Sequence, residues 1–252
     1  MSESTKSRIT FTLLAAVVRP AMNLMMGRRW EGMENLPREG GFIACPNHVT
    51  EIDPLVVGHF FYRQGFLPRY LAKASLFKVP VLGGALRATK QVPVQRGAAG
   101  AAASLDAAQA VLDAGGALIV YPEGTLTRDP DLWPMKGRTG AARLALQTGA
   151  PVIPVAHWGA QDVLPRYGKM LHLFPRKHVR VLVGKPVDLS DLRGVPLTKA
   201  VLEEATERIM AALSAQVASL RGEPAPAERW DPARKGQKAV GRGFDPETET
   251  KE

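Results

Sequence analysis

The stretch FIACPNHVTEIDP, residues 42–54, indicates the fold because it passes from an apolar strand through a polar turn into a helix. Phe42–Cys45 is a short apolar run with the length of a buried strand. A helix begins just after His48, and either Thr50 or Asp53 can serve as its N-cap. A strand followed by a helix is the repeating unit of α/β proteins.

Short apolar runs and helical patterns alternate along the rest of the chain. The predicted strands are Phe42–Cys45, Tyr70–Ala74, Gln91–Gln95, Ala117–Tyr121, Val152–Ala156, Leu171–Phe174 and Val179–Val183. The predicted helices are Pro54–Tyr62, Val79–Arg87, Ala101–Ala114, Arg138–Gln147 and Thr198–Leu220, the last stopped by Gly222. This order predicts an α/β domain over residues 30–221, with a largely parallel central sheet flanked by helices and a hairpin made by the last two strands.

The charge balance narrows the classes of partner. The chain has 252 residues and a net charge of +9, which suggests a polyanion such as nucleic acid, an anionic membrane or a phosphorylated substrate. Aromatic residues make up only 6% of the chain and no nucleic-acid motif is visible, so we expect no nucleic-acid partner. The single cysteine, Cys45, excludes an internal disulfide framework and a Cys-rich zinc site.

Residues 1–29 predict an amphipathic helical segment that associates with a membrane. The apolar run Ile9–Val18 is followed by Arg19-Pro20, and a charge at the centre of a spanning helix costs ~2.5–3.5 kcal/mol. We therefore expect one or two short helices lying in the interface, with basic residues facing anionic headgroups. A signal peptide and a helix packed on the core are the alternatives. Residues 222–252 lose periodicity and predict a mostly disordered tail.

His48 and Asp53 form a candidate catalytic pair. Their side chains can meet if His48 lies on the loop after the strand and Asp53 lies in the first helical turn. The carboxylate would then bind one imidazole nitrogen and leave the other to act as a general base on a substrate hydroxyl. Helix capping by Asp53 and a structural role for His48 are equally compatible with the spacing.

Two other polar clusters follow predicted strands, and sites of α/β sheets gather at such strand ends. Arg96 follows one strand, and its planar guanidinium suits a phosphate, although an arginine at such a place is more often a solvated surface residue. Glu123 lies in a turn, where it can position Arg96, bind a substrate hydroxyl or only shape the turn. Lys73, Arg128, Lys136 and Arg138 can add positive charge nearby.

Together these segments resemble the lysophosphatidate acyltransferase family of glycerolipid acyltransferases. The family's Asn-His-x-x-x-x-Asp block is present as Asn47, His48 and Asp53, and its second block as Pro93-Val94-Gln95-Arg96. The third block, Phe-Pro-Glu-Gly-Thr-Arg-Ser, appears as residues 121–127, and the fourth as Pro151-Val152-Ile153-Pro154-Val155. The four blocks occur in the family's order within residues 30–185.

The resemblance implies transfer of a fatty acyl chain from acyl-CoA or acyl-carrier protein to the hydroxyl of a lysophospholipid, most simply 1-acylglycerol-3-phosphate. It implies that His48 is the general base and that Asp53 orients it. It also implies that Arg96 and the turn Glu123-Gly124-Thr125 hold the acceptor. The reaction would need no metal and no cofactor, and it would take place at the cytoplasmic face of an anionic membrane as a step of phospholipid biosynthesis.

One position departs from the family pattern. The arginine of the third block is Leu126 here, so either Arg128 takes its place or the acceptor is another lysolipid or a glycolipid. Two other functions are compatible with the sequence. One is a thioesterase in which Cys45 is the nucleophile and His48 its base. The other is a membrane-binding protein without catalytic activity.

Overall fold

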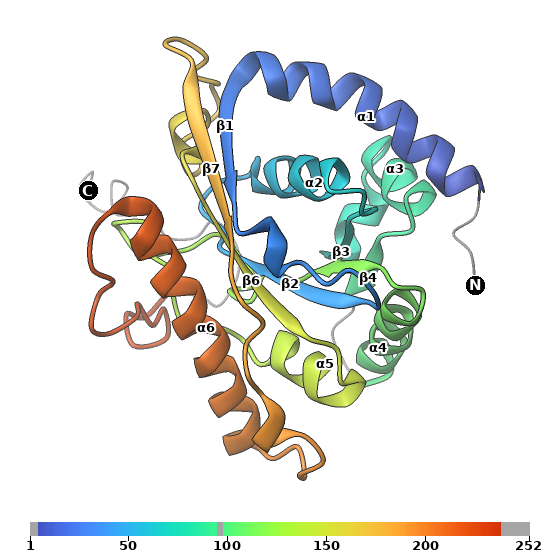
Figure 1. Cartoon of the computed structure of the whole chain (residues 1–252), viewed down its shortest axis with the longest axis vertical. Coiled ribbons are helices and arrows are strands. Elements are labelled where there is room, and N and C mark those ends of the chain that lie inside the picture. Colours follow the sequence, from blue (N-terminus) through green and yellow to red (C-terminus); the bar gives the residue numbers. More distant parts are fainter. Residues whose placement is uncertain (1–4, 95–97, 238–252) are drawn as a thin grey trace.

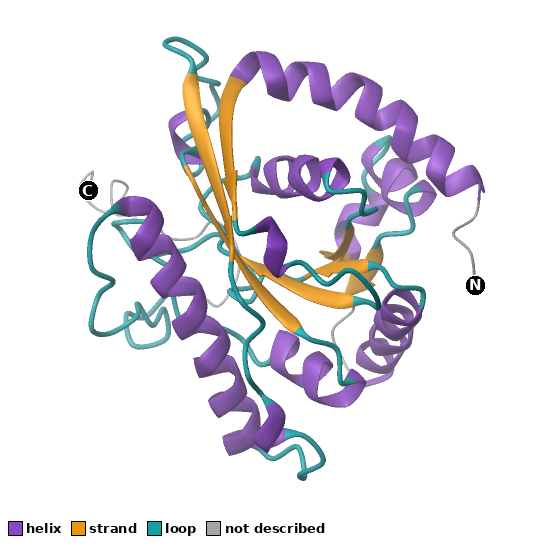
Figure 2. Cartoon of the chain, in the orientation of Figure 1, coloured by secondary structure: helices purple, strands orange, loops and turns teal. Residues whose placement is uncertain are grey.

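The computed structural model describes residues 5–94 and 98–237. Its centre is a seven-stranded sheet in the order β1-β7-β6-β2-β5-β3-β4, in which every neighbouring pair is parallel except β6 and β7 (Figures 1 and 2). The strands are β1 Met26–Glu31, β2 Phe42–Pro46, β3 Arg69–Lys73, β4 Val92–Val94, β5 Ala117–Ile119, β6 Val152–Trp158 and β7 Lys177–Val183. The predicted α/β fold with a largely parallel sheet is confirmed.

Helices cover both faces of the sheet. They are α1 Thr5–Met25, α2 Asp53–Arg63, α3 Leu82–Ala88, α4 Ala98–Asp113, α5 Gly140–Thr148 and α6 Lys199–Arg221. α1 and α2 pack on one face, and α4, α5 and α6 pack on the other (Figure 1). α3 lies beside α1.

Strand β2 shows how the sheet holds two cores. Phe42 and Ala44 belong to the core under α1 and α2, whereas Ile43 and Cys45 belong to the core under α4, α5 and α6. Successive side chains of a strand point to opposite faces, so a strand covered on both faces must be apolar throughout. All five residues of β2 are buried, and the strand therefore occupies the middle of the sheet, between β6 and β5.

Two expectations about strands were wrong. Residues 171–174 form no strand, and Phe174 is 91% exposed, so the predicted hairpin does not exist. Instead β7 pairs antiparallel with β6 and parallel with β1. Strand β1 was not predicted because its sequence, MGRRWE, carries adjacent arginines, which an edge strand can leave in solvent. It also crosses the predicted domain boundary at residue 29.

Helix α1 is a single element of 21 residues with Pro20 inside it, longer than the short interfacial helices expected. Phe11 and Met22 are buried, whereas Val17 is 73% and Leu24 is 80% exposed. The helix thus has an apolar face against the domain and further apolar side chains on the outside. Among the described residues, no helix combines the length and hydropathy needed to cross a bilayer.

The described part of the C-terminal segment packs on the domain. Gly222 ends α6 in the left-handed conformation, as its position predicts. The chain then turns back, and the Lys136 amide donates a hydrogen bond to the carbonyl oxygen of Trp230 at 2.9 Å. The Lys136 ammonium pairs with Asp231 at 2.8 Å. Up to residue 237 the chain therefore differs from the predicted disordered tail, and residues 238–252 lie outside the described part.

Substitution of Gly32 tests the contact that joins β1 to β7. Gly32 has φ of 76°, and a Cβ there would lie 2.0 Å from the carbonyl oxygen of Val183. Gly40 has φ of 74° but nothing within 4 Å. Both Gly→Ala variants bear the left-handed cost of about 1–2 kcal/mol, and Gly32→Ala should lose a further ~1–3 kcal/mol for the clash. Urea unfolding of the two variants measures the difference, and equal losses would contradict the assigned contact.

Candidate active site

His48 and Asp53 meet at the carboxyl end of β2. The Nδ1 atom of His48 lies 2.9 Å from Oδ2 of Asp53. The same oxygen accepts the backbone N–H groups of Val49 at 2.6 Å and Thr50 at 2.8 Å. The loop is therefore wrapped around the carboxylate, which explains how residues five apart come into contact. Asp53 is the first residue of α2 and Ile52 is its N-cap, so neither Thr50 nor Asp53 holds the predicted N-cap position.

The histidine is held on a second side by an aromatic ring. The His48 imidazole and the Tyr121 ring are stacked, with centroids 4.1 Å apart and planes 25° apart. Because Nδ1 is bound to Asp53, Nε2 is the nitrogen left for a substrate. The side chain of His48 is 17% exposed and that of Asp53 is fully buried. This is the geometry of an oriented general base.

Glu123 lies beside His48 but faces the protein interior. Its two carboxylate oxygens accept the backbone N–H groups of His48 and Met135, each at 3.0 Å. The residue is 1% exposed, and burial raises the pKa of Glu123 to about 8, although the two backbone hydrogen bonds lower it. The Thr127 amide donates to the carbonyl oxygen of His48 at 2.7 Å. The Glu123 turn therefore positions the backbone of His48.

A second support comes from His157, which the sequence analysis did not single out. His157 is buried at the end of β6. Its backbone N–H donates to Oδ1 of Asn47, and the Asn47 amide returns a hydrogen bond to its carbonyl oxygen. Its Nε2 lies 2.8 Å from the carbonyl oxygen of Asn47 and 3.8 Å from Oδ2 of Asp53. The signal available in the sequence was only its place at a strand end.

His48 opens onto a cavity of ≈ 2010 Å³ that is lined by parts of α1 to α5 and by the ends of the central strands. Its apolar lining includes Phe11, Leu14, Leu55, Tyr62, Leu76 and Leu82. Within the described part of the chain, the basic side chains of the lining are Arg19, Lys73, Lys78, Arg138 and Arg143, and its single acidic residue is Glu51. The cavity is thus mainly apolar with an excess of positive charge, which suits an amphipathic anion.

The other predicted site residues are distributed unevenly. Gly124 lines the cavity, whereas Thr125 and Arg128 do not, and Arg128 is buried. Arg96 lies outside the described residues. Leu126 is also buried. Arg143 is a basic residue of the cavity that the sequence analysis did not single out, because it falls inside a predicted helix with no motif around it.

Cys45 does not have the surroundings of a nucleophile. It is fully buried, in the core under α4 and α5, and burial raises the pKa of its thiol to about 12. A thiolate is the reactive form, and an inaccessible thiol with this pKa supplies little of it. The structure therefore gives no support to the thioesterase hypothesis.

Fold and site together define an α/β enzyme in which a His–Asp pair opens onto a mainly apolar cavity. Residues 27–158 match the Acyltransferase family, and the chain belongs to that family. This confirms the resemblance indicated by the four sequence blocks, and the protein is an acyltransferase.

Named relatives extend the comparison. The chain is 28% identical to a 1-acyl-sn-glycerol-3-phosphate acyltransferase of Bacillus subtilis, over 79% of this chain and 92% of that protein. It is 32% identical to one of Borreliella burgdorferi, over 52% of this chain and 51% of that protein. The crystal structure of the 1-acyl-sn-glycerophosphate acyltransferase PlsC of Thermotoga maritima superposes with a TM-score of 0.66 at 23% identity, covering 89% and 83% of the two chains, and so shows the same fold.

The raised pKa of Glu123 predicts a pH-dependent stability. Between the ordinary value of 4.5 and about 8, the folded state retains a proton that the unfolded state has lost. The free energy of unfolding should therefore decrease as pH rises through this range. Glu123→Gln removes the titration, so its unfolding free energy should vary less with pH. Urea unfolding at several pH values measures both slopes, and identical slopes would show that Glu123 does not titrate in this range.

Proposed function

We propose that the chain transfers a fatty acyl group from an acyl-CoA or acyl-carrier-protein thioester to the hydroxyl of a lysophospholipid, most simply 1-acylglycerol-3-phosphate, to give phosphatidate. The observation that carries the proposal is the 2.9 Å contact between Nδ1 of His48 and Oδ2 of Asp53 beside a mainly apolar cavity. The names of the relatives from Bacillus subtilis and Borreliella burgdorferi support the acceptor.

The proposed reaction moves one proton in and out of His48. Nε2 takes the proton of the acceptor hydroxyl while Asp53 stabilises the imidazolium through Nδ1. The oxygen attacks the thioester carbonyl carbon, and the carbon–sulfur bond breaks when the tetrahedral intermediate collapses. The leaving thiolate then recovers the proton from His48. The products are an ester and a free thiol, and no acyl group is bound to the enzyme at any stage.

For the acceptor phosphate we favour Arg138 over Arg128. Arg138 lies against Gly124, because a Cβ on Gly124 would fall 2.7 Å from Cδ of Arg138. Gly124 follows Glu123, whose carboxylate holds the backbone of His48. A guanidinium at this place, in the cavity lining, is suited to an acceptor whose hydroxyl is at His48. The alternative acceptor, another lysolipid or a glycolipid, is favoured by Leu126 in the family's arginine position.

We also propose that α1 places the enzyme on an anionic membrane. Its exposed apolar residues include Ile9, Leu13, Val17 and Leu24. Basic residues lie in its first turn and just beyond its C-terminal end. An amphipathic helix with basic flanks binds at the boundary of headgroups and acyl chains. A location on the cytoplasmic face stays a prediction.

Replacement of His48 tests the chemistry. His48→Ala should lower kcat by roughly 10²–10⁴-fold, the usual contribution of a positioned general base. The exposed His172 gives a matched control, and His172→Ala should retain the wild-type rate. The assay supplies labelled acyl-CoA with a panel of lysolipids and identifies products by mass. If only free fatty acid is formed by the wild type, the transferase proposal is wrong.

Replacement of Arg138 tests the acceptor site. Arg138→Gln should raise the KM for lysophosphatidate by about 10–100-fold, the value of a charged hydrogen bond, and leave the KM for acyl-CoA unchanged. The control is Lys136→Gln, which also removes one positive charge. Lys136 lies two residues before Arg138 but outside the cavity lining, so this variant should change neither KM. Equal effects of both variants would remove Arg138 from the site.

A further inference from the structure

Four arginines from separate parts of the chain gather where α1 meets β1. Arg19 belongs to α1, Arg28 to β1 and Arg63 to the last turn of α2, while Arg176 directly precedes β7. The four positions span more than 150 residues of sequence, so their proximity results from the fold.

Hydrogen bonds hold two of these arginines at the end of α1. The Arg176 guanidinium donates to the carbonyl oxygens of Asn23 at 2.6 Å and Met26 at 3.2 Å. Nη1 of Arg28 donates to the Asn23 side chain and lies 3.0 Å from Nε2 of His59. The loop before β7 and the start of β1 therefore both contact Asn23, near the C-terminal end of α1.

The cluster has an excess of positive charge that the described chain leaves uncompensated. Burial, and then the charges of Arg63 and Arg19, lower the pKa of Arg28, and Arg176 adds to this effect. None of the four forms an ion pair with a carboxylate of the described residues, whereas the neighbouring Arg29 pairs with Glu31 at 2.9 Å. Such a group of cations is suited to an external anion.

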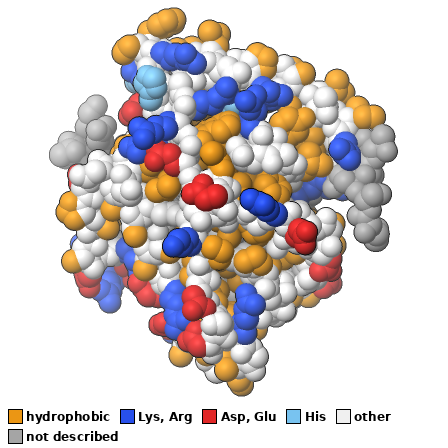
Figure 3. Space-filling view, viewed as in Figure 1, with side chains coloured by type: hydrophobic (Ala, Val, Ile, Leu, Met, Phe, Trp, Pro, Cys, Tyr) orange, Lys and Arg blue, Asp and Glu red, His pale blue; other side chains and the backbone are white. Residues whose placement is uncertain are grey.

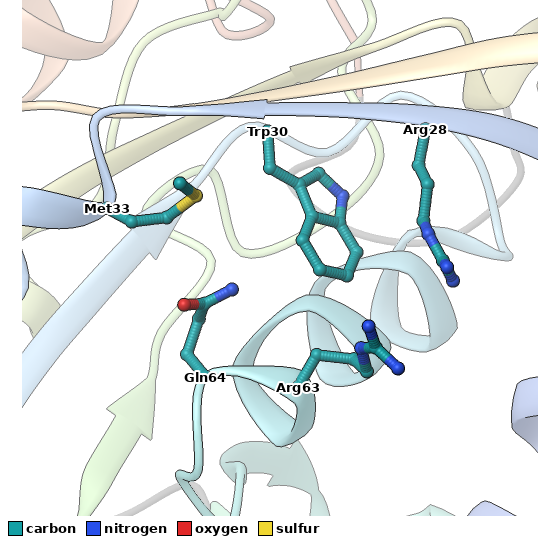
Figure 4. Close-up of a pocket in the computed structure, with 5 residues that line it drawn as sticks. All are labelled: Arg28, Trp30, Met33, Arg63 and Gln64. Carbon is teal, nitrogen blue, oxygen red and sulfur yellow. The ribbon is translucent and has the colours of Figure 1, made fainter.

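Two of the arginines line a pocket. Figure 4 shows Arg28 from β1 and Arg63 from α2 pointing toward the same space, with the Trp30 ring beside them. The pocket has a volume of ≈ 390 Å³, and Met33 and Gln64 complete its lining. Two guanidinium groups can bind the oxygens of a phosphate through several hydrogen bonds, and a tryptophan is typical of the membrane–water interface.

Exposed apolar side chains adjoin the arginines. Leu24 of α1 is 80% exposed, Phe174 is 91% exposed and Met170 is 72% exposed. Phe174 lies two residues before Arg176, and Leu24 follows Asn23. Both are therefore next to the hydrogen bond between Arg176 and Asn23. Figure 3 shows Lys and Arg side chains gathered in the upper part of this face, with hydrophobic side chains bordering them. Apolar side chains around a cationic pocket are suited to a lipid more than to a free anion.

We propose that this arginine pocket binds the phosphate of an anionic membrane phospholipid, while Leu24 and Phe174 enter the acyl layer beside it. The proposal rests on the proposed membrane association and adds a discrete headgroup site to it. Arg19 also lines the active-site cavity, but Arg28 and Arg63 do not. The pocket of Arg28 and Arg63 is distinct from the acceptor site, because the eleven residues of α2 place Arg63 about 15 Å from Asp53. A lysophosphatidate whose hydroxyl is at His48 cannot reach that far with its own phosphate.

The test measures binding of the full chain to vesicles. The variant Arg28→Gln/Arg63→Gln should bind vesicles of phosphatidylcholine mixed with phosphatidylglycerol about 10–30-fold more weakly than the wild type, and should bind pure phosphatidylcholine equally well. The matched control is Lys185→Gln/Arg193→Gln. It removes two charges beyond the other end of β7, and it should bind like the wild type. Circular dichroism checks folding, and the single variant Arg63→Gln replaces the double one if that does not fold.

Two results would overturn the proposal. One is an equal loss in the control, which would mean that net charge alone attracts the protein. The other is retained vesicle binding together with a raised KM for acyl-CoA in neutral detergent micelles, which would assign the pocket to the phosphates of the donor. His48→Ala should bind vesicles like the wild type, so failure of the headgroup site and failure of the acyl-transfer proposal remain distinguishable.

Discussion

The carboxylate of Asp53 is the group on which the arrangement of the site depends. One of its oxygens receives the His48 imidazole and two consecutive backbone amides, those of Val49 and Thr50. These three contacts determine the path of the loop between β2 and α2, and the loop determines where His48 lies. A buried carboxylate is costly unless it is hydrogen-bonded, so the loop and the carboxylate stabilise each other.

Around this centre, the supporting residues act on the backbone and leave the imidazole free for chemistry. Glu123 binds the amide of His48, Thr127 binds its carbonyl group, and His157 is joined to Asn47 by paired hydrogen bonds. These residues come from three different strand ends of one sheet. The parallel topology places those ends on the same edge, which is why segments more than 100 residues apart can fix one histidine.

The sequence predicted those parts of the molecule that depend on local residues alone. Strand β2 is apolar throughout because both of its faces are covered, and the His48–Asp53 pair lies in a local turn. Strand β1 was missed because Arg28 and Arg29 obscure its pattern. The burial of Glu123 could not be predicted, because its carboxyl group is held by the amide of Met135, a contact that no local pattern shows. Arg128 is closer in sequence to the third block, but Arg138 is the arginine that lines the cavity. Sequence distance alone does not show which of the two faces the cavity.

Helix α2 joins two chemically different places at a fixed separation. Its first residue is Asp53, whose carboxylate binds His48, and its last is an arginine on the outer surface. Both charges complement the helix dipole. A helix packed on the core through Val57, Phe60 and Phe61 resists bending and stretching. In the proposed function it would act as a rigid spacer. The depth of His48 below a membrane surface that touches Arg63 would then be set by the number of helical turns. Insertion or deletion of a turn would change that depth by about 5.4 Å and leave the chemical groups themselves unaltered.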